Sequence, residues 1–368
     1  MERMRAWRGL LGLGALILTT SLVGCGSNAG DKTDVAKPEG GTPSGGASAG
    51  SKPRIVLVTN SNSDYWTAAE KGMKEAGEKL GAEVEMKRND GSVEGQIRLL
   101  EEALSASDVK GVAVSVVEPQ AAGIIDAMRK LKEAGKAIIT VDSDVASSDA
   151  DVRRAYVGSN NSKAGETLGK AAAQVRPQGG TVLMFVGSMT AANARERRDG
   201  FYIGAGSKFV SPPLEVFEDG GTDMNKAQSM AADSITKHPD AGVLLGLYSY
   251  NGPRIALETS KNPEFRKKAL VACFDLDEQL IEHLEKGNVD FTVVQNPYEI
   301  GYQAIRMLKA MAEDDKKVLG ELLPGGKDLY DTGFRVIVPS DTSPIKGDNV
   351  LTIQAMKEWL ASKGLKSS

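Results

Sequence analysis

The amino-acid sequence predicts an α/β fold of two parallel sheets, each covered by helices on both faces. Short, continuous apolar runs alternate with segments whose apolar residues recur at helical spacing, starting at about residue 54. The alternation restarts after residue 157 and continues to about residue 312. Residues 25–368 number 344, which is enough for two domains of ordinary size. Repeated strand–helix units therefore predict a doubly wound parallel sheet, here twice over.

The first 24 residues have the pattern of an export signal. Arg3, Arg5 and Arg8 give a cationic start, and residues 10–22 are apolar or small. This stretch is too short and too rich in glycine for a membrane-crossing helix, which needs about 20 apolar residues. A small residue directly before Cys25 resembles the bacterial lipoprotein signal, which implies cleavage before Cys25 and lipidation of its thiol. An ordinary secretory signal with a chance cysteine is the alternative.

The segment 25–52 is expected to be the lipidated cysteine followed by a flexible tether. Residues 26–52 contain seven glycines and almost nothing apolar, so they cannot bury enough surface to offset their ordering entropy. A flexible chain of this length has a root-mean-square end-to-end distance of about 30 Å. The expected location is the cell envelope on the periplasmic side, with lipid anchoring to a membrane through Cys25.

Each half of the chain contains its own series of strands and helices. In the first half, strands are expected at 55–58, 84–86, 112–117, 137–141 and 156–157, with helices at 69–80, 93–104 and 120–134. In the second half, strands are expected at 181–186, 214–217, 242–247, 269–273 and 291–295, with helices at 162–175, 193–205, 223–236, 252–259, 276–286 and 297–312. A last helix at 353–363 places Met356, Trp359 and Leu360 on one face. That face is expected to dock on a domain, and a partner contact is the alternative.

Composition and motifs argue against several functional classes. The formal net charge is −4 without a basic stripe, so nucleic-acid binding is not expected. The two histidines, His238 and His283, lie far apart in sequence, so neither a metal site nor a catalytic triad is visible. Residues 165–171 lack the spacing and the Ser or Thr of a phosphate-binding loop. Cys273 lies in an apolar run and is interpreted as a buried small hydrophobe. We therefore expect no enzymatic activity and no cofactor.

Polar and aromatic side chains gather where the expected strands end, which is where ligands of parallel sheets bind. They are Tyr65, Trp66, Ser115, Asp142, Asn160, Asn161, Arg195, Asn251, Asp275 and Gln295. Flat rings can stack on the C–H faces of a sugar, while carboxylates, amides and a guanidinium can satisfy its hydroxyl groups. Each residue also has a structural alternative. Trp66 can be core packing, the two aspartates can be helix caps, and Arg195 can lie on a solvated helix face.

Several segments, in the same order along the chain, resemble one known family. They are 64–72, 95–102, 137–142, 157–165, 194–201, 274–275 and 295–301. Together they resemble periplasmic sugar-binding proteins of the ribose and galactose type, the solute receptors of ABC importers, over about residues 54–338. Two segments depart from the family pattern, because Ser143 replaces a common Arg and residues 248–253 replace a common Asn-Asp. These departures leave the identity of the sugar open.

The resemblance implies a role for each candidate ligand-binding residue. Tyr65 and Trp66 would stack on the sugar, Asp142 and Asp275 would accept hydrogen bonds from its hydroxyl groups, and Arg195 would be a bidentate donor. The remaining candidates would supply further contacts. They are Ser115, Ser159, Asn251, Phe274 and Gln295.

The resemblance also implies a type I periplasmic binding fold with two lobes and a hinge of three crossovers. The first lobe would comprise 53–158 plus 296–330, the second 159–295 plus 331–350, followed by a C-terminal helix and tail at 351–368. The expected function is a monomeric, lipid-anchored solute receptor that captures a monosaccharide or similar solute and presents it to an ABC permease. The alternative is a sensory receptor for a sugar-like signal that passes its state to a membrane kinase.

Overall fold

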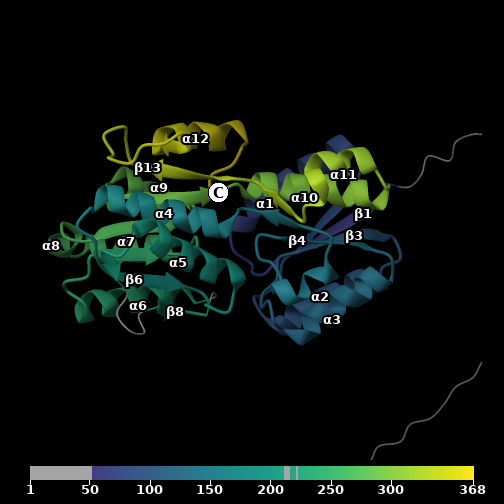
Figure 1. The fold of residues 1–368 in the computed structure, drawn as a ribbon, viewed down its shortest axis with the longest axis horizontal. Coiled ribbons are helices and arrows are strands. Elements are labelled where there is room, and N and C mark those ends of the chain that lie inside the picture. Colours follow the sequence, from purple (N-terminus) through teal and green to yellow (C-terminus); the bar gives the residue numbers. More distant parts are fainter. Residues whose placement is uncertain (1–51, 211–215, 221–222) are drawn as a thin grey trace, which may run out of the picture. The chain divides into compact units, whose positions relative to one another are not determined.

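The computed structural model describes residues 52–210, 216–220 and 223–368 (Figure 1). The expected signal peptide at 1–24, the lipidation site Cys25 and nearly all of the tether lie outside the described residues. Residues Ser51–Ser368 form one compact unit. Within the described ranges, no helix is both long enough and apolar enough to cross a membrane.

The first sheet has six parallel strands in the order β12-β5-β4-β3-β1-β2. These strands are β1 (Arg54–Val58), β2 (Glu83–Lys87), β3 (Val109–Val114), β4 (Ala137–Val141), β5 (Tyr156–Gly158) and β12 (Leu329–Asp331). Its helices are α1 (Tyr65–Leu80), α2 (Val93–Ser105), α3 (Ala122–Glu133), α10 (Pro297–Ala312) and α11 (Lys316–Leu322). Ile55 and Leu57 pack with α1 and α10, while Val56 and Val58 pack with α2 and α3. A strand covered on both faces explains the continuous apolar run of β1.

The second sheet has the order β14-β13-β11-β10-β9-β6-β7, and β8 also pairs with β6. These strands are β6 (Gly180–Val186), β7 (Phe209–Val210), β8 (Val216–Glu218), β9 (Val243–Gly246), β10 (Leu270–Phe274), β11 (Phe291–Gln295), β13 (Phe334–Val338) and β14 (Val350–Thr352). Its helices are α4 (Asn161–Val175), α5 (Ala192–Ala205), α6 (Met224–Lys237), α7 (Asn251–Ser260), α8 (Pro263–Arg266), α9 (Glu278–Glu285) and α12 (Ile353–Ser362). Helices α4 and α5 pack on one face, and α6, α7, α9 and α12 pack on the other. The expected α/β class with two doubly wound sheets is confirmed.

The chain passes between the two sheets three times, as the resemblance implies. It leaves the first sheet after Gly158, returns to it after Gln295 and leaves it again between Asp331 and Phe334 (Figure 1). Strand β12 ends one residue beyond the expected lobe boundary at 330, and β14 extends the second sheet to residue 352.

The expectation of a purely parallel second sheet is wrong at one position. Strand β13 runs antiparallel to β11, with Gln295 opposite Phe334. The reason is the crossing itself: the chain leaves the second sheet at the end of β11 and re-enters at the same end. The returning strand must therefore run in the opposite direction. Strand β14 then pairs parallel with β13.

Local signals account for several element boundaries. Helix α1 ends at Gly81, whose φ of 73° lies in the left-handed region that favours glycine. The side chains of Ser92, Asn160 and Asp277 accept hydrogen bonds from the first turns of α2, α4 and α9. Helices α8 and α11 and the short turns Ser147–Val152 and Pro324–Gly326 were not expected from periodicity. They are too short to show a helical repeat clearly.

Candidate functional site

A cavity lies where the carboxyl ends of both sheets meet, and we call it the central cavity. Residues that follow strands of the first sheet line one wall, and residues that follow strands of the second sheet line the other. It leaves about 140 Å³ for the centres of water-sized molecules. A site needs about 10–15 Å³ of such space to hold a single water, so this cavity has room for several. The cavity therefore has the size for one small polar solute.

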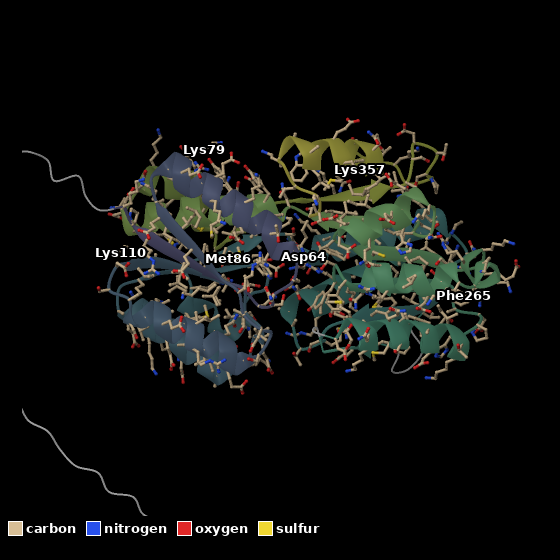
Figure 2. All side chains as sticks on the ribbon, turned by 180° about the vertical axis from the view of Figure 1, so that it is seen from behind. Asp64, Lys79, Met86, Lys110, Phe265 and Lys357 are labelled. Atoms are coloured by element: carbon tan, nitrogen blue, oxygen red, sulfur yellow. The ribbon has the colours of Figure 1, made fainter. Side chains whose placement is uncertain are left out.

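Tyr65 and Trp66 occupy the first turn of α1, directly after Asp64, which is labelled in Figure 2. Their rings meet edge to face, with centroids 5.2 Å apart. Trp66 is 1% exposed and also belongs to the hydrophobic core of the first sheet. Trp66 therefore has both roles: it packs in the core and it lines the cavity.

Asp142 follows β4 and supplies the carboxylate of the first wall. Its φ of 58° is in the left-handed region, which is rare for residues other than glycine and is a feature of functional sites. Its Oδ2 accepts hydrogen bonds from Ser115 Oγ at 3.1 Å and from Asn60 Nδ2 at 3.4 Å. Burial raises the pKa of Asp142, and the charge of Arg197 is the largest opposing influence. Ser115 does not line the cavity; it holds Asp142 in place.

Asp275 follows β10 and supplies the carboxylate of the second wall. Its φ is 62°, so the two cavity aspartates share the same rare backbone conformation. Gln295 Nε2 donates to Asp275 Oδ1 at 3.1 Å. Burial raises the pKa of Asp275 to about 6, against the opposing charge of Arg197 and the hydrogen bond from Gln295.

Arg197 is the cationic side chain that lines the central cavity, whereas Arg195, which was expected to face the ligand, does not line it. Arg197 is 1% exposed, and its guanidinium lies 3.8 Å from the centroid of the Phe274 ring. Its Nε donates to Asn161 Oδ1 at 3.0 Å, and its Nη1 donates to the Leu247 carbonyl at 2.8 Å. Arg195 instead donates to the backbone carbonyls of residues 189 and 190.

Helical spacing explains why the second arginine of this segment faces inward. Ala194, Arg197 and Phe201 are all buried and follow one another at intervals of three and four residues, so they share one face of α5. Arg195 lies off that face and is only partly buried. The pattern of buried neighbours, rather than the order of the arginines, identifies the residue in the cavity.

Two tyrosines of the second wall were not singled out from the sequence. Tyr248 and Tyr250 line the cavity, and their ring centroids are 6.3 Å apart. The Tyr248 hydroxyl donates to Asn193 Oδ1 at 3.1 Å, and the Tyr250 hydroxyl donates to Asp219 Oδ1 at 2.7 Å. Their rings therefore face the cavity while their hydroxyls are held by the surrounding protein. The segment 248–253 contains both residues, and its departure from the family pattern was the available signal.

The structure brings five of the ten expected ligand-binding residues to the central cavity: Tyr65, Trp66, Asp142, Asp275 and Gln295. The other five lie outside the lining. Ser115 and Arg195 have been described above, and Phe274 lies beneath Arg197. Ser159 Oγ donates to the Gly333 carbonyl at 2.9 Å, where two crossings meet. Asn251 Nδ2 donates to Asp219 at 2.9 Å and begins α7. These residues support the walls and do not face the cavity.

Buried polar atoms without hydrogen-bond partners concentrate in this cavity. Among the described residues, five such side-chain atoms belong to residues that line the cavity. They are Tyr65 Oη, Trp66 Nε1, Ser143 Oγ, Arg197 Nη2 and Gln295 Oε1. The Tyr65 hydroxyl faces Asp142 and helps to lower its pKa, yet it lacks the geometry of a normal hydrogen bond. Leaving such groups unpaired is costly, so the cavity has both donors and acceptors available for a polar guest.

No candidate metal site is found in the described part of the chain. No three His, Cys, Asp or Glu side chains there lie close enough together to hold a metal ion. Cys273 is buried and free, as its apolar run predicts, and burial raises the pKa of its thiol.

Comparisons with known proteins identify the family and the fold. A family model described as "Periplasmic binding protein domain" matches residues 54–317. An ABC transporter solute-binding protein from Burkholderia graminis, solved with D-arabinose, is 22% identical with a TM-score of 0.70; the match covers 81% of this chain and 99% of that one. GanP, a glucose-galactose binding protein from Geobacillus stearothermophilus, is 27% identical with a TM-score of 0.68, covering 79% and 99%. A XylFII–LytSN complex matches at 26% identity with a TM-score of 0.66, covering 79% and 99%. A search of curated proteins gives no match.

Proposed function

We propose that this chain, which belongs to the periplasmic binding protein domain family, captures a monosaccharide in the central cavity and delivers it to an ABC importer. Its type I periplasmic binding protein fold, expected from the sequence, is confirmed by the family match and by the solved structures it resembles. The family is extracytoplasmic, and we place this protein on the outer side of a cell membrane. We propose binding without chemical conversion of the ligand.

The single observation that carries this proposal is that the central cavity is lined by unpaired polar atoms together with aromatic rings. A sugar presents hydroxyl groups that both donate and accept, and it also has apolar C–H faces. Two carboxylates, a guanidinium and an amide can satisfy the hydroxyl groups. The rings of Tyr65, Trp66, Tyr248 and Tyr250 line the cavity and supply apolar surface. GanP, at 27% identity, is a glucose-galactose binding protein, which supports a sugar as the ligand.

A ligand in the central cavity would touch residues of both sheets at once. Asp142 and Tyr65 come from the first sheet, while Asp275 and Arg197 come from the second. The ligand would therefore favour conformations in which both walls contact it, to the extent that it binds those conformations more tightly. The three crossings would serve as the hinge.

The test is a calorimetric titration with D-arabinose, D-glucose, D-galactose, D-fucose and D-tagatose. At least one sugar should bind with a Kd in the micromolar range or below and raise the melting temperature, because it binds only the native state. The radius of gyration in solution scattering should fall at saturation. Absence of binding to every sugar in the panel would contradict the proposal, and turnover of a glycoside would show an enzyme instead.

A sensory receptor is the second candidate, and one comparison favours it. The XylFII–LytSN complex shows that a similar chain assembles with a second protein. In this alternative the sugar-bound form would pass its state to a membrane kinase. Deleting the ABC permease distinguishes the two: import of the sugar should stop if the chain is an importer component, whereas a sugar response that persists favours the sensor.

We further propose that Cys25 anchors the protein through acyl chains. The Cys25→Ser variant should be released from membranes, because a thiol is the site of lipid attachment and the tether has no apolar segment of its own. The measurement is the distribution between soluble and membrane fractions after a carbonate wash. The Ser27→Ala variant, two residues along the tether, is the control and should stay with the membrane. Cys25→Ser protein that remains in the pellet would contradict lipid anchoring.

A further inference from the structure

The segment that follows α12 returns to the backbone of Leu276 and Gln295, beside the central cavity. Gly364 adopts a φ of 61°, and the Leu365 amide donates to the Leu360 carbonyl at 2.9 Å, which turns the chain sharply at the end of the helix. Leu365 packs against the hydrophobic core on that face of the second sheet. Two more residues lead to Ser368, which is 3% exposed although it lies in no helix or strand.

Ser368 makes three hydrogen bonds, all to the backbone of Leu276 and Gln295. Its amide donates to the Leu276 carbonyl at 2.8 Å, and its carbonyl accepts from the Leu276 amide at 2.8 Å. This reciprocal pair has the pattern of two paired antiparallel strands. Its Oγ donates to the Gln295 carbonyl at 3.2 Å. Residue 368 therefore bridges the chain just after β10 and the last residue of β11.

Leu276 and Gln295, the two residues that Ser368 bonds, are the neighbours or carriers of two cavity side chains, those of Asp275 and Gln295. Leu276 directly follows Asp275, whose left-handed backbone conformation persists only when its surroundings hold it. Gln295 donates to the Asp275 carboxylate through its side chain. The Asp275 backbone has two further supports, from the Val293 carbonyl and from Thr292 Oγ1. Ser368 adds to these supports by bonding both the amide and the carbonyl of Leu276, the residue directly after Asp275.

We propose that Ser368 is a positioning residue for sugar binding, which holds Asp275 and Gln295 in the orientation that the ligand meets. The inference rests on the proposed function of the central cavity. Ser368 does not line the cavity and acts only through the backbone of these neighbours. A ligand site held in its bound geometry beforehand binds more tightly, because less ordering remains to be done on binding.

The positioning role can be separated from the docking of α12. Ile353, Met356 and Leu360 are buried and fix the helix on the second sheet. The turn at Gly364 and the packing of Leu365 also come before the residue that bonds Leu276 and Gln295. Removal of residues 366–368 therefore leaves the helix and its turn in place.

The experiment compares the full-length protein with a variant that lacks residues 366–368 and with Ser368→Ala. Affinity is measured by calorimetry with the same five sugars, and amide exchange of the peptide containing Leu276 is measured without ligand. The truncation should weaken binding roughly tenfold, because it removes all three hydrogen bonds of Ser368 and part of their energy serves to preorganise the site. It should also speed amide exchange at Leu276 by at least about tenfold.

Two controls identify the contacts responsible. Ser368→Ala keeps the reciprocal backbone pair, so it should restore affinity to within about threefold of the full-length protein. Lys366→Ala changes an exposed side chain and should leave both measurements unchanged. Affinity within twofold after truncation, or unchanged exchange at Leu276, would overturn the positioning role. If no sugar binds the full-length protein, the proposed function fails, and the exchange measurement alone decides whether residue 368 clamps Leu276.

Discussion

Replacing Asp275 with asparagine is expected to weaken sugar binding about 100-fold while raising the stability of the ligand-free protein. A carboxylate that accepts hydrogen bonds from sugar hydroxyl groups makes charge-assisted bonds, each worth about 1.5–3 kcal/mol. An amide offers one weaker acceptor in the same place. Asparagine also tolerates the left-handed backbone that Asp275 adopts, so the fold around the site should persist.

The stability gain follows from the raised pKa of Asp275. Burial raises this pKa to about 6 from the ordinary 3.8, so the native state holds the proton more tightly than the unfolded chain does. The favourable contribution is complete below about pH 4 and is lost as the pH rises through about 6. A difference of about two pKa units corresponds to about 3 kcal/mol at neutral pH, as an upper estimate. An asparagine side chain at this position has no charge to bury, so Asp275→Asn should flatten this part of the pH profile.

Asp277→Asn is the matched control. The pKa of Asp277 is also raised to about 6 by burial, and the residue lies only two positions away. It caps α9 and does not line the central cavity, and asparagine caps a helix about as well as aspartate. The control should therefore keep its sugar affinity. Calorimetry and urea unfolding at pH 5 and pH 7.5 provide the measurements. Sugar affinity of Asp275→Asn within threefold of the original would remove Asp275 from the binding site.

Strand-end chemistry made part of the site predictable from the sequence. Asp142 and Asp275 could be found because the carboxyl ends of parallel strands meet at one edge of each sheet. Tyr65 and Trp66 could be found for the same reason, because they come after the end of β1. Sequence position alone could not separate residues that line the cavity from those that hold it, as Ser115 and Asn251 show. That distinction depends on side-chain direction, which periodicity resolves only to a helix face.

The remaining differences come from contacts between distant parts of the chain. The antiparallel direction of β13 follows from where the chain re-enters the second sheet, which no local pattern records. The contact of Ser368 with Leu276 joins positions 92 residues apart and depends on how α12 docks. The burial of Arg197 could have been predicted from the sequence, because its helical spacing from Ala194 and Phe201 indicates the buried face of α5.

Replacing Arg197 with methionine should both abolish sugar binding and destabilise the protein, with a distinctive pH dependence. Methionine keeps much of the apolar stem over Phe274 but removes the charge that faces Asp142 and Asp275. Removing one partner from buried charges costs about 3–5 kcal/mol. The Arg197 charge is the largest influence lowering the pKa of both aspartates, so its loss raises both values further.

The direction of the pH effect distinguishes this loss of charge from a simple packing defect. With both pKa values raised in the native state, the variant loses stability as the pH rises and recovers it as the aspartates take up protons. The stability difference from the original protein should therefore be larger at pH 8 than at pH 5, as measured by urea unfolding. A deficit independent of pH would indicate packing alone. Arg195→Met, which loses only bonds to its own loop, should cost about 1 kcal/mol or less and keep sugar affinity, because Arg195 is outside the cavity. If Arg195→Met instead abolishes binding and Arg197→Met does not, the assignment of the cavity arginine is wrong.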